Sequence, residues 1–172
     1  MSIKFSIFTP TNDTTWIRDT YQSLLKQTYS NWEWVIVPNG ETPVDLPPEI
    51  VADSRAVIRP TTSNKIGALK HYACSQAAGD IYVELDHDDI LVPWALNSIV
   101  TAHNREGPAF HYSDSANFFP DGTPEIYGSA YGWRTYDFHH EGKAYKAHKA
   151  FPATPRSLGE IYYAPNHVRA WH

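Results

Sequence analysis

The sequence predicts an α/β protein built on an open, mostly parallel β-sheet with helices on both faces. Short β-branched and aromatic segments alternate with segments of helical periodicity over residues 3–112. One of these apolar segments, residues 32–37, is nearly continuous, which is typical of strands that helices cover on both sides. Because alternating strands and helices connect through right-handed crossovers, one parallel sheet is expected.

The first strand is expected at residues 3–8, where it runs into a cluster of turn residues. A helix is expected over residues 16–28, because apolar side chains recur there at helical spacing. Asp13 or Thr14 is placed to cap its first turn. The second strand is expected at residues 32–37, where the apolar character is nearly unbroken.

The middle of the chain continues this alternation. Residues 41–54 contain three prolines and predict a loop with a helical turn, followed by a short strand at 56–58. A helix is expected over residues 66–77, with Gly79 as its stop signal. Residues 81–85 then predict a further strand.

The pattern changes character after residue 114, which we take as the boundary between a core, residues 1–114, and a second region, residues 115–172. Helical periodicity disappears there, and aromatic residues become frequent. The remaining expected elements are a helix beginning near Pro93, a strand at 110–112, a hairpin turn at 118–123, an irregular aromatic stretch at 131–158, a strand at 160–164 and the start of a helix at 166–172.

Composition excludes several classes of protein. The 172 residues carry 14 basic and 19 acidic side chains, a net charge of -5, so the basic field that nucleic acids or anionic membranes require is missing. A hydrophobic share of 42% argues against disorder, and a single cysteine argues against a disulfide scaffold. The start of the chain does not resemble a signal peptide, and the longest apolar run, residues 90–96, is too short for a membrane span. We therefore expect a soluble, cytoplasmic protein.

The sharpest chemical signal is the run Asp86-His87-Asp88-Asp89, which follows a predicted strand. Three carboxylates in four residues repel one another unless a cation neutralises them. A hard divalent ion, completed by phosphate oxygens, would remove that conflict. The alternative is that Asp88 or Asp89 only caps the helix that begins near Pro93.

The chain resembles family 2 glycosyltransferases of the GT-A fold over roughly residues 3–112. This Rossmann-like fold agrees with the sheet expected above. The segments that carry the resemblance are FSIFTPTN (5–12), SLLKQTYSNWEWVIV (23–37), NKIG (64–67), AGD (78–80) and LDHDDILVP (85–93).

The resemblance implies a binding site for a nucleotide-diphosphate sugar, with a UDP-sugar favoured and a GDP-sugar possible. Thr9, Pro10 and Thr11 fall in the loop that family members wrap around the base. Asn39 stands where the family usually has an aspartate that accepts a hydrogen bond from uracil; an amide oxygen accepts the same bond, while its NH2 group also suits another base. Lys70 stands where the family often has an arginine, and it could contact the base or a phosphate, or lie on a solvated helix face.

The resemblance also implies a metal. Asp86-His87-Asp88 matches the family's D-x-D motif, with Asp86 near the ribose or the metal and Asp88 on the Mn2+ or Mg2+ ion that bridges the diphosphate. His87 is a neighbour in the nucleotide site rather than a ligand, because such ions prefer oxygen. The implied reaction is inverting transfer of the sugar to an unknown sugar or other hydroxyl acceptor.

The carboxylate base of an inverting transferase is not assigned, and Asp114, Glu125, Glu141 and Glu160 are all conceivable. One alternative is a domain that binds nucleotide sugar without turnover, because the family's usual base region is absent. A less favoured one is a phosphohydrolase whose metal ligands would come from Asp86, His87, Asp88, His111 and Asp114. The oligomeric state is not indicated.

Overall fold

The computed structural model describes residues 2–128, 131–161 and 164–172, and the chain divides into two compact units. The first unit comprises Met1–His111 together with Ala170–His172, and the second comprises Tyr112–Arg169. Each unit has its own sheet.

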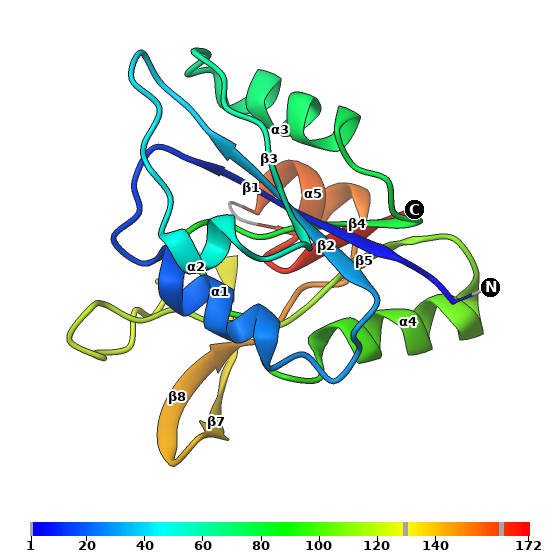
Figure 1. The fold of residues 1–172 in the computed structure, drawn as a ribbon. Helices are drawn as coiled ribbons and strands as arrows, with labels where there is room; N and C mark the ends of the chain where they lie inside the picture. The colour runs from blue at the N-terminus through cyan, green and yellow to red at the C-terminus, as the bar shows by residue number, and fades with distance from the viewer. Residues whose placement is uncertain (1, 129–130, 162–163) are drawn as a thin grey trace. The chain divides into compact units, whose positions relative to one another are not determined.

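The main sheet has six strands in the order β3-β2-β1-β4-β9-β5 (Figure 1). Strand β1 pairs in parallel with β2 on one side and with β4 on the other, and β2 pairs in parallel with β3. This confirms the predicted parallel arrangement. The strands are β1 (Phe5–Thr11), β2 (Trp32–Pro38), β3 (Ala56–Ile58), β4 (Ile81–Glu84), β5 (Phe110–Tyr112) and β9 (Arg169–Trp171).

Helices cover both faces of this sheet. Because neighbouring residues of a strand point to opposite sides, a strand such as β2 packs against helices on both faces. Phe8, Val35 and Val37 form one buried cluster with side chains of α3. Trp34, on the other face, stacks on Tyr21 of α1 with ring centroids 5.9 Å apart. The helices of the first unit are α1 (Ile17–Leu25), α2 (Pro48–Val51), α3 (Ile66–Ser75) and α4 (Ala95–Glu106).

Two helix boundaries differ from the prediction. Helix α1 begins at Ile17 after Trp16, which makes no side-chain capping bond, so neither Asp13 nor Thr14 caps it. The Asp13 carboxylate instead accepts hydrogen bonds from the N–H and hydroxyl of Thr15, at 2.8 and 2.6 Å. Helix α3 ends at Ser75, before the predicted stop signal at Gly79, whose role is different.

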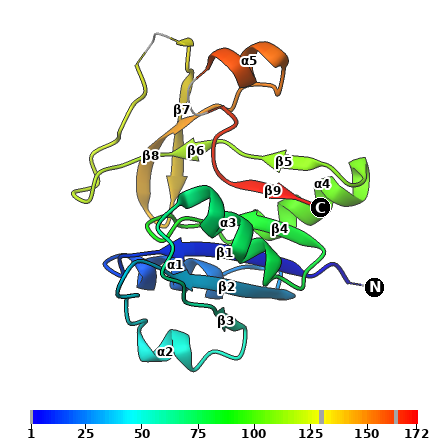
Figure 2. The same ribbon diagram turned by 90° about the horizontal axis from the view of Figure 1, so that it is seen from above.

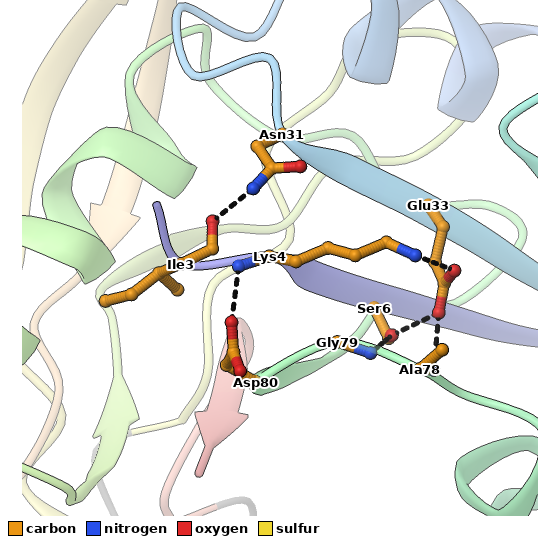
Figure 3. Close-up of polar contacts among 8 residues, drawn as sticks. All are labelled: Ile3, Lys4, Ser6, Asn31, Glu33, Ala78, Gly79 and Asp80. Carbon is orange, nitrogen blue, oxygen red and sulfur yellow. Dashed lines mark hydrogen bonds and ion pairs between the residues drawn. The ribbon is translucent and has the colours of Figure 1, made fainter. Parts of the chain in front are cut away.

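A buried carboxylate ties together the amino-terminal part of the sheet (Figure 3). Glu33 forms an ion pair with Lys4 and accepts hydrogen bonds from the Ser6 hydroxyl and the Ala78 N–H, both at 2.6 Å. These donors more than offset burial, which alone would raise the pKa of Glu33, so its net pKa is lowered. The network joins β1, β2 and the segment that leads into β4.

Gly79 lies against this network and leaves no room for a side chain. Its N–H donates to the Ser6 hydroxyl at 2.8 Å. A Cβ atom at Gly79 would lie 2.7 Å from the Lys4 carbonyl oxygen and 2.7 Å from the Ser6 hydroxyl oxygen. The next residue, Asp80, accepts a hydrogen bond from the Lys4 N–H at 2.8 Å. The Ala78-Gly79-Asp80 segment therefore positions the start of β4 against β1.

The second unit contains a three-stranded antiparallel sheet in the order β6-β8-β7 (Figure 2). The hairpin turn predicted at 118–123 is confirmed, because Phe119 and Thr123 are hydrogen-bonded at 2.8 Å and Gly122 has φ of +84°. The elements of this unit are β6 (Ser115–Ala116), β7 (Thr135–His140), β8 (Lys143–His148) and α5 (Pro155–Glu160).

The prediction of an irregular stretch at 131–158 is wrong where β7 and β8 form a hairpin. Its turn, Glu141-Gly142, has positive φ at both residues, 50° and 76°, as a type I′ turn requires. An Asp137–Lys146 ion pair links opposite positions of the two strands. Half of the residues of these strands are exposed and only two are buried, so the apolar alternation that marks a half-buried strand is missing.

The last predicted elements also differ. Of the strand expected at 160–164, Glu160 instead ends α5, and residues 162–163 lie outside the described residues. The helix expected at 166–172 is wrong, because Arg169–Trp171 form β9, between β4 and β5. Trp171 packs against Phe8 and Phe110, with ring centroids 5.6 and 6.2 Å away. This tertiary contact, invisible in a local pattern, selects the extended conformation.

Among the residues described, no helix combines the length and the apolar character that crossing a bilayer requires.

Candidate functional site

The polar segments that follow β1, β2 and β4 lie at one edge of the sheet. Thr11 and Pro38 are register partners at the ends of β1 and β2, and Glu84 at the end of β4 pairs with Phe8. The Asn39 N–H donates to the Thr11 carbonyl oxygen at 2.9 Å. Because the carboxyl ends of parallel strands meet at one edge, this is where such a fold places ligands.

The segment Thr9-Pro10-Thr11 is itself buried in this edge. The Thr9 hydroxyl donates to the Leu85 carbonyl oxygen at 2.7 Å and accepts from the Trp34 indole N–H at 2.8 Å. The Thr11 hydroxyl donates to the Asp13 carbonyl oxygen. These hydroxyls therefore hold the loops of the edge together, and contact of this segment with a base stays a prediction.

Asn39 lies at the same edge, where its backbone forms an isolated parallel β-bridge with that of Thr61. The residue is only 8% exposed. Within the part of the chain that the structure describes, the side-chain amide of Asn39 has no hydrogen-bond partner. Its oxygen and NH2 group are thus both available to a ligand.

Lys70 reaches from α3 to the end of β4, where it forms an ion pair with Glu84. Its side chain is 28% exposed and that of Glu84 is 6% exposed, so Lys70 does not lie on a freely solvated helix face. The negative charge of Glu84 also contributes, after burial, to raising the pKa of the Cys74 thiol. Contact of Lys70 with a nucleotide stays a prediction.

Glu84 is a functional candidate that the sequence interpretation missed. It stands two residues before Asp86, and one carboxylate oxygen of each lies within 4.8 Å of the other. The spacing i, i+2 at a strand end was the available signal, because it places both side chains on one face. Oxygen atoms at this separation suit a hard divalent ion such as Mg2+ or Mn2+.

The segment after Asp86 makes a turn, in which the Asp89 N–H donates to the Asp86 carbonyl oxygen at 3.2 Å. Asp86 is half-buried and Asp88 is exposed. The backbone is anchored to α1, because the His87 carbonyl oxygen accepts from the Thr20 hydroxyl at 2.8 Å. The anchor uses a backbone atom, and the carboxylate of Asp88 remains exposed.

The alternative role for these acids, capping the next helix, is wrong. Helix α4 begins at Ala95, and its N-cap is Trp94, which makes no side-chain capping bond. Neither Asp88 nor Asp89 is therefore an N-cap. A further carboxylate, Asp13, is near His87: its pKa is lowered chiefly by hydrogen bonds from Thr15 and to a smaller degree by His87.

The four candidate bases lie in the second unit. Asp114 accepts hydrogen bonds from the Tyr136 hydroxyl and the Ala150 N–H, at 3.0 and 2.7 Å, which braces that unit. Together with burial, Asp114 raises the pKa of Tyr136. Glu160 pairs with Arg156, and Glu141 occupies the hairpin turn. These contacts single out neither Glu125 nor any of the other three as a base.

Solved structures with the same fold include TarS 1-349 from S. aureus, at 22% identity and a TM-score of 0.55, over 63% of this chain and 34% of TarS. TarS 1-349 in complex with UDP-GlcNAc matches at 23% identity and a TM-score of 0.54, over 63% of this chain and 33% of that one. The mannosyltransferase PcManGT from Pyrobaculum calidifontis, in complex with GDP-Man and Mn2+, matches at 19% identity and a TM-score of 0.50, over 70% of this chain and 37% of PcManGT. The chain thus spans about a third of the length of these proteins.

A search among curated proteins finds no match. The family model described as Glycosyl transferase family 2 matches residues 6–159, which is most of the chain. It includes the strands β1, β2 and β4 and the acidic segment that follows them. The chain therefore belongs to glycosyl transferase family 2.

Proposed function

We propose that this chain binds a nucleoside diphosphate sugar and transfers the sugar to a hydroxyl acceptor, with the help of a divalent cation. One observation carries the proposal: in a chain of this family, Asn39, Glu84 and Asp86 gather at the carboxyl edge of the parallel sheet. That edge is where open α/β sheets bind nucleotides.

Asp86 and Asp88 are the proposed ligands of a Mn2+ or Mg2+ ion. Oxygen donors fit such ions, and Glu84 lies close enough to Asp86 to support the site, with Lys70 balancing its charge. When bound, the ion would stabilise the negative charge that grows on the diphosphate as it leaves the sugar. His87 would contact the nucleotide rather than the ion, because hard cations prefer oxygen.

The proposed base site is formed by Asn39 and the Thr9–Thr11 segment. The Asn39 amide can accept a hydrogen bond from uracil or donate one to a carbonyl group of guanine. A UDP-sugar is the favoured donor, and UDP-GlcNAc is bound by the similar structure of TarS. A GDP-sugar is the alternative, since PcManGT, with the same fold, is in complex with GDP-Man.

The proposed transfer is inverting, which requires a carboxylate to remove the proton from the acceptor hydroxyl. Asp114, Glu125, Glu141 and Glu160 are the candidates, and substitution of each by its amide would identify the base. A second function is binding of a nucleotide sugar without turnover, since the contacts of these four carboxylates mark none of them as a base.

Binding is tested by thermal unfolding with UDP or GDP, with and without Mn2+. At one hundred times the dissociation constant, a ligand stabilises the fold by about 2.7 kcal/mol. We expect stabilisation that needs both nucleotide and metal in the parent chain, and its loss in Asp86→Asn and Asp88→Asn. Asp137→Asn, which removes an exposed carboxylate of β7, should keep it. Retention of the full shift in Asp86→Asn would refute the proposed metal site.

Turnover is tested separately, with UDP-GlcNAc or GDP-mannose and a pool of hydroxyl acceptors. Appearance of a glycosylated acceptor supports transfer. Metal-linked binding without any product supports the binding-only function. Hydrolysis of the donor to a nucleoside monophosphate and a sugar 1-phosphate, without sugar transfer, would instead indicate the phosphohydrolase alternative.

A further inference from the structure

A second group of potential metal ligands lies in the first unit, on elements other than those of the carboxylate edge. It consists of His103 on α4, His111 on β5 and His172, which directly follows β9. The imidazole centroids of His103 and His111 are 6.2 Å apart, and those of His103 and His172 are 5.5 Å apart. We call these three residues the histidine cluster.

Two nitrogens of the cluster are unusual, because they are buried without a hydrogen-bond partner. Nδ1 of His103 and Nε2 of His111 have no partner among the residues that the structure describes. A buried polar atom without a partner costs free energy, so native proteins usually satisfy such atoms with protein groups, water or an ion. Two such nitrogens on neighbouring rings indicate a shared ligand.

The ring spacing is compatible with one metal ion. In a tetrahedral zinc site with Zn–N bonds of about 2.0–2.1 Å, neighbouring imidazole centroids lie roughly 5 Å apart. The observed separations of 5.5 and 6.2 Å are close to this value. The three donor nitrogens do not yet converge, and the His103 and His172 rings are nearly parallel at 23°. His172 is exposed, so its ring can turn towards the other two without disturbing the core.

The charges around the cluster suit a cation. Glu106, in the last turn of α4, lies near enough to His111 for the two to attract each other, while it pairs with Arg105. Burial, followed by the nearby His103, lowers the pKa of His111, which keeps its imidazole neutral. Neutral imidazole is the form that binds a metal, and the Glu106 carboxylate can supply charge compensation or a further ligand.

We propose that His103, His111 and His172 bind Zn2+ or a similar divalent transition-metal ion, at a site independent of the proposed nucleotide site. Imidazole nitrogens favour Zn2+, Ni2+ or Cu2+, whereas the oxygen donors around Asp86 favour Mg2+ or Mn2+. The two sites therefore select different metals. An ion held by these three residues would link α4 to the sheet strands β5 and β9, and so stabilise that side of the first unit.

The test is calorimetric titration of the full chain with Zn2+ at pH 7.5, in the absence of nucleotide. We expect one ion per chain, with affinity lowered roughly tenfold or more in His103→Gln, His111→Gln and His172→Gln. His139→Gln, which removes an exposed histidine of β7, is the matched control and should bind as the parent does. An excess of Mg2+ should not compete.

His172→Gln is the decisive variant, because an exposed side chain at this position can be replaced without unfolding the protein. Parent-like zinc affinity in His172→Gln would overturn the three-histidine site. Asp86→Asn separates this proposal from the proposed function: it should lose the metal-linked nucleotide response and keep zinc binding. Loss of zinc binding in Asp86→Asn, with the histidine variants unchanged, would place the zinc ion on the carboxylates and refute the inference.

Discussion

The two ends of the parallel strands use carboxylates in opposite ways. At the amino-terminal end, Glu33 is 7% exposed and is held by Lys4, Ser6 and Ala78 (Figure 3). At the carboxyl end, Glu84 pairs with Lys70, but the acidic run that follows continues to the exposed Asp88. A carboxylate is therefore structural at the end of the sheet where the chain itself supplies the cation and the hydrogen-bond donors that surround it.

This contrast has a physical basis in the cost of burying charge. A buried carboxylate is stable only when cations and N–H groups replace the water that it loses. Glu33 meets this condition within the chain. Asp88 remains in solvent, where crowding by Asp86 and Asp89 is tolerable and a divalent ion can still bind.

Glu33→Ala should have the largest effect, lowering the free energy of unfolding by about 3 kcal/mol, because it leaves a partly buried Lys4 and two other donors without their acceptor. Chemical denaturation with urea measures it. Glu33→Gln keeps an acceptor oxygen and should lose less. A loss below about 1 kcal/mol in Glu33→Ala would show that water replaces the carboxylate easily.

Gly79→Ala should lower the free energy of unfolding by about 2 kcal/mol, because its Cβ would meet backbone atoms of Lys4 and Ser6 at 2.7–2.8 Å. The matched control is Gly67→Ala in α3, where a Cβ meets no atom within 4 Å. That control should be neutral or stabilising, since alanine favours a helix. Equal urea midpoints for the two variants would contradict the packing argument.

Thr9→Val tests whether the carboxyl end is also held from within. Loss of the hydroxyl removes the hydrogen bonds to Leu85 and from Trp34, which should cost about 1–2 kcal/mol of unfolding free energy. Thr101→Val, on an exposed turn of α4, should change stability by no more than about 0.5 kcal/mol. If Thr9→Val stays folded but binds UDP more weakly than its loss of stability explains, Thr9 contacts the base directly.

Lowering the pH should reduce the stability that Glu33 contributes at the amino-terminal end of the sheet. Its pKa is lowered in the folded chain from an ordinary value of 4.5, so it contributes stability that is present above pH 4.5 and is lost as the pH falls through the folded pKa. Between pH 6 and pH 3, the free energy of unfolding should therefore decline more steeply in the parent than in Glu33→Gln. Parallel curves would mean that Glu33 is not selectively stabilised as an anion.

Asp88→Asn should have the smallest effect on the metal-free chain, a gain of up to about 0.5 kcal/mol in unfolding free energy, because one of the crowded negative charges disappears. Addition of Mn2+ and UDP should reverse the order, since the parent gains stability and the variant does not. Thermal unfolding in both conditions measures this. A stability loss in the metal-free variant would show that Asp88 has a structural role.

Much of the first unit was predictable, because its strands and helices have strong local patterns. The apolar run at β2 and the helical spacing in α1 both appear in the structure, and the carboxyl-end loops meet as parallel strands require. The Asp86-His87-Asp88-Asp89 run was also visible, because acidic residues crowd at a strand end. Glu84 was not predicted, because a single acidic residue within a strand pattern gives only a weak metal signal until the fold brings one of its carboxylate oxygens within 4.8 Å of an oxygen of Asp86.

The second unit was less predictable, because its side chains are largely exposed. The β7–β8 hairpin lacks apolar alternation, and its Glu-Gly turn is a weaker signal than Asn-Gly. Gly79 was assigned to a helix end, although its function is to admit the backbone of β1. For Gly79 the deciding partners, Lys4 and Ser6, are distant in the sequence.

Local patterns of residues are enough to specify the alternation of strands and helices, the parallel sheet and the acidic segment after β4, because periodicity and residue type act within a few positions. Three other features depend on packing in the folded chain: Arg169–Trp171 form a strand between β4 and β5, Lys70 pairs with Glu84, and three histidines from separate elements lie close together. These contacts join residues far apart in the chain, where packing and charge burial outweigh local preference.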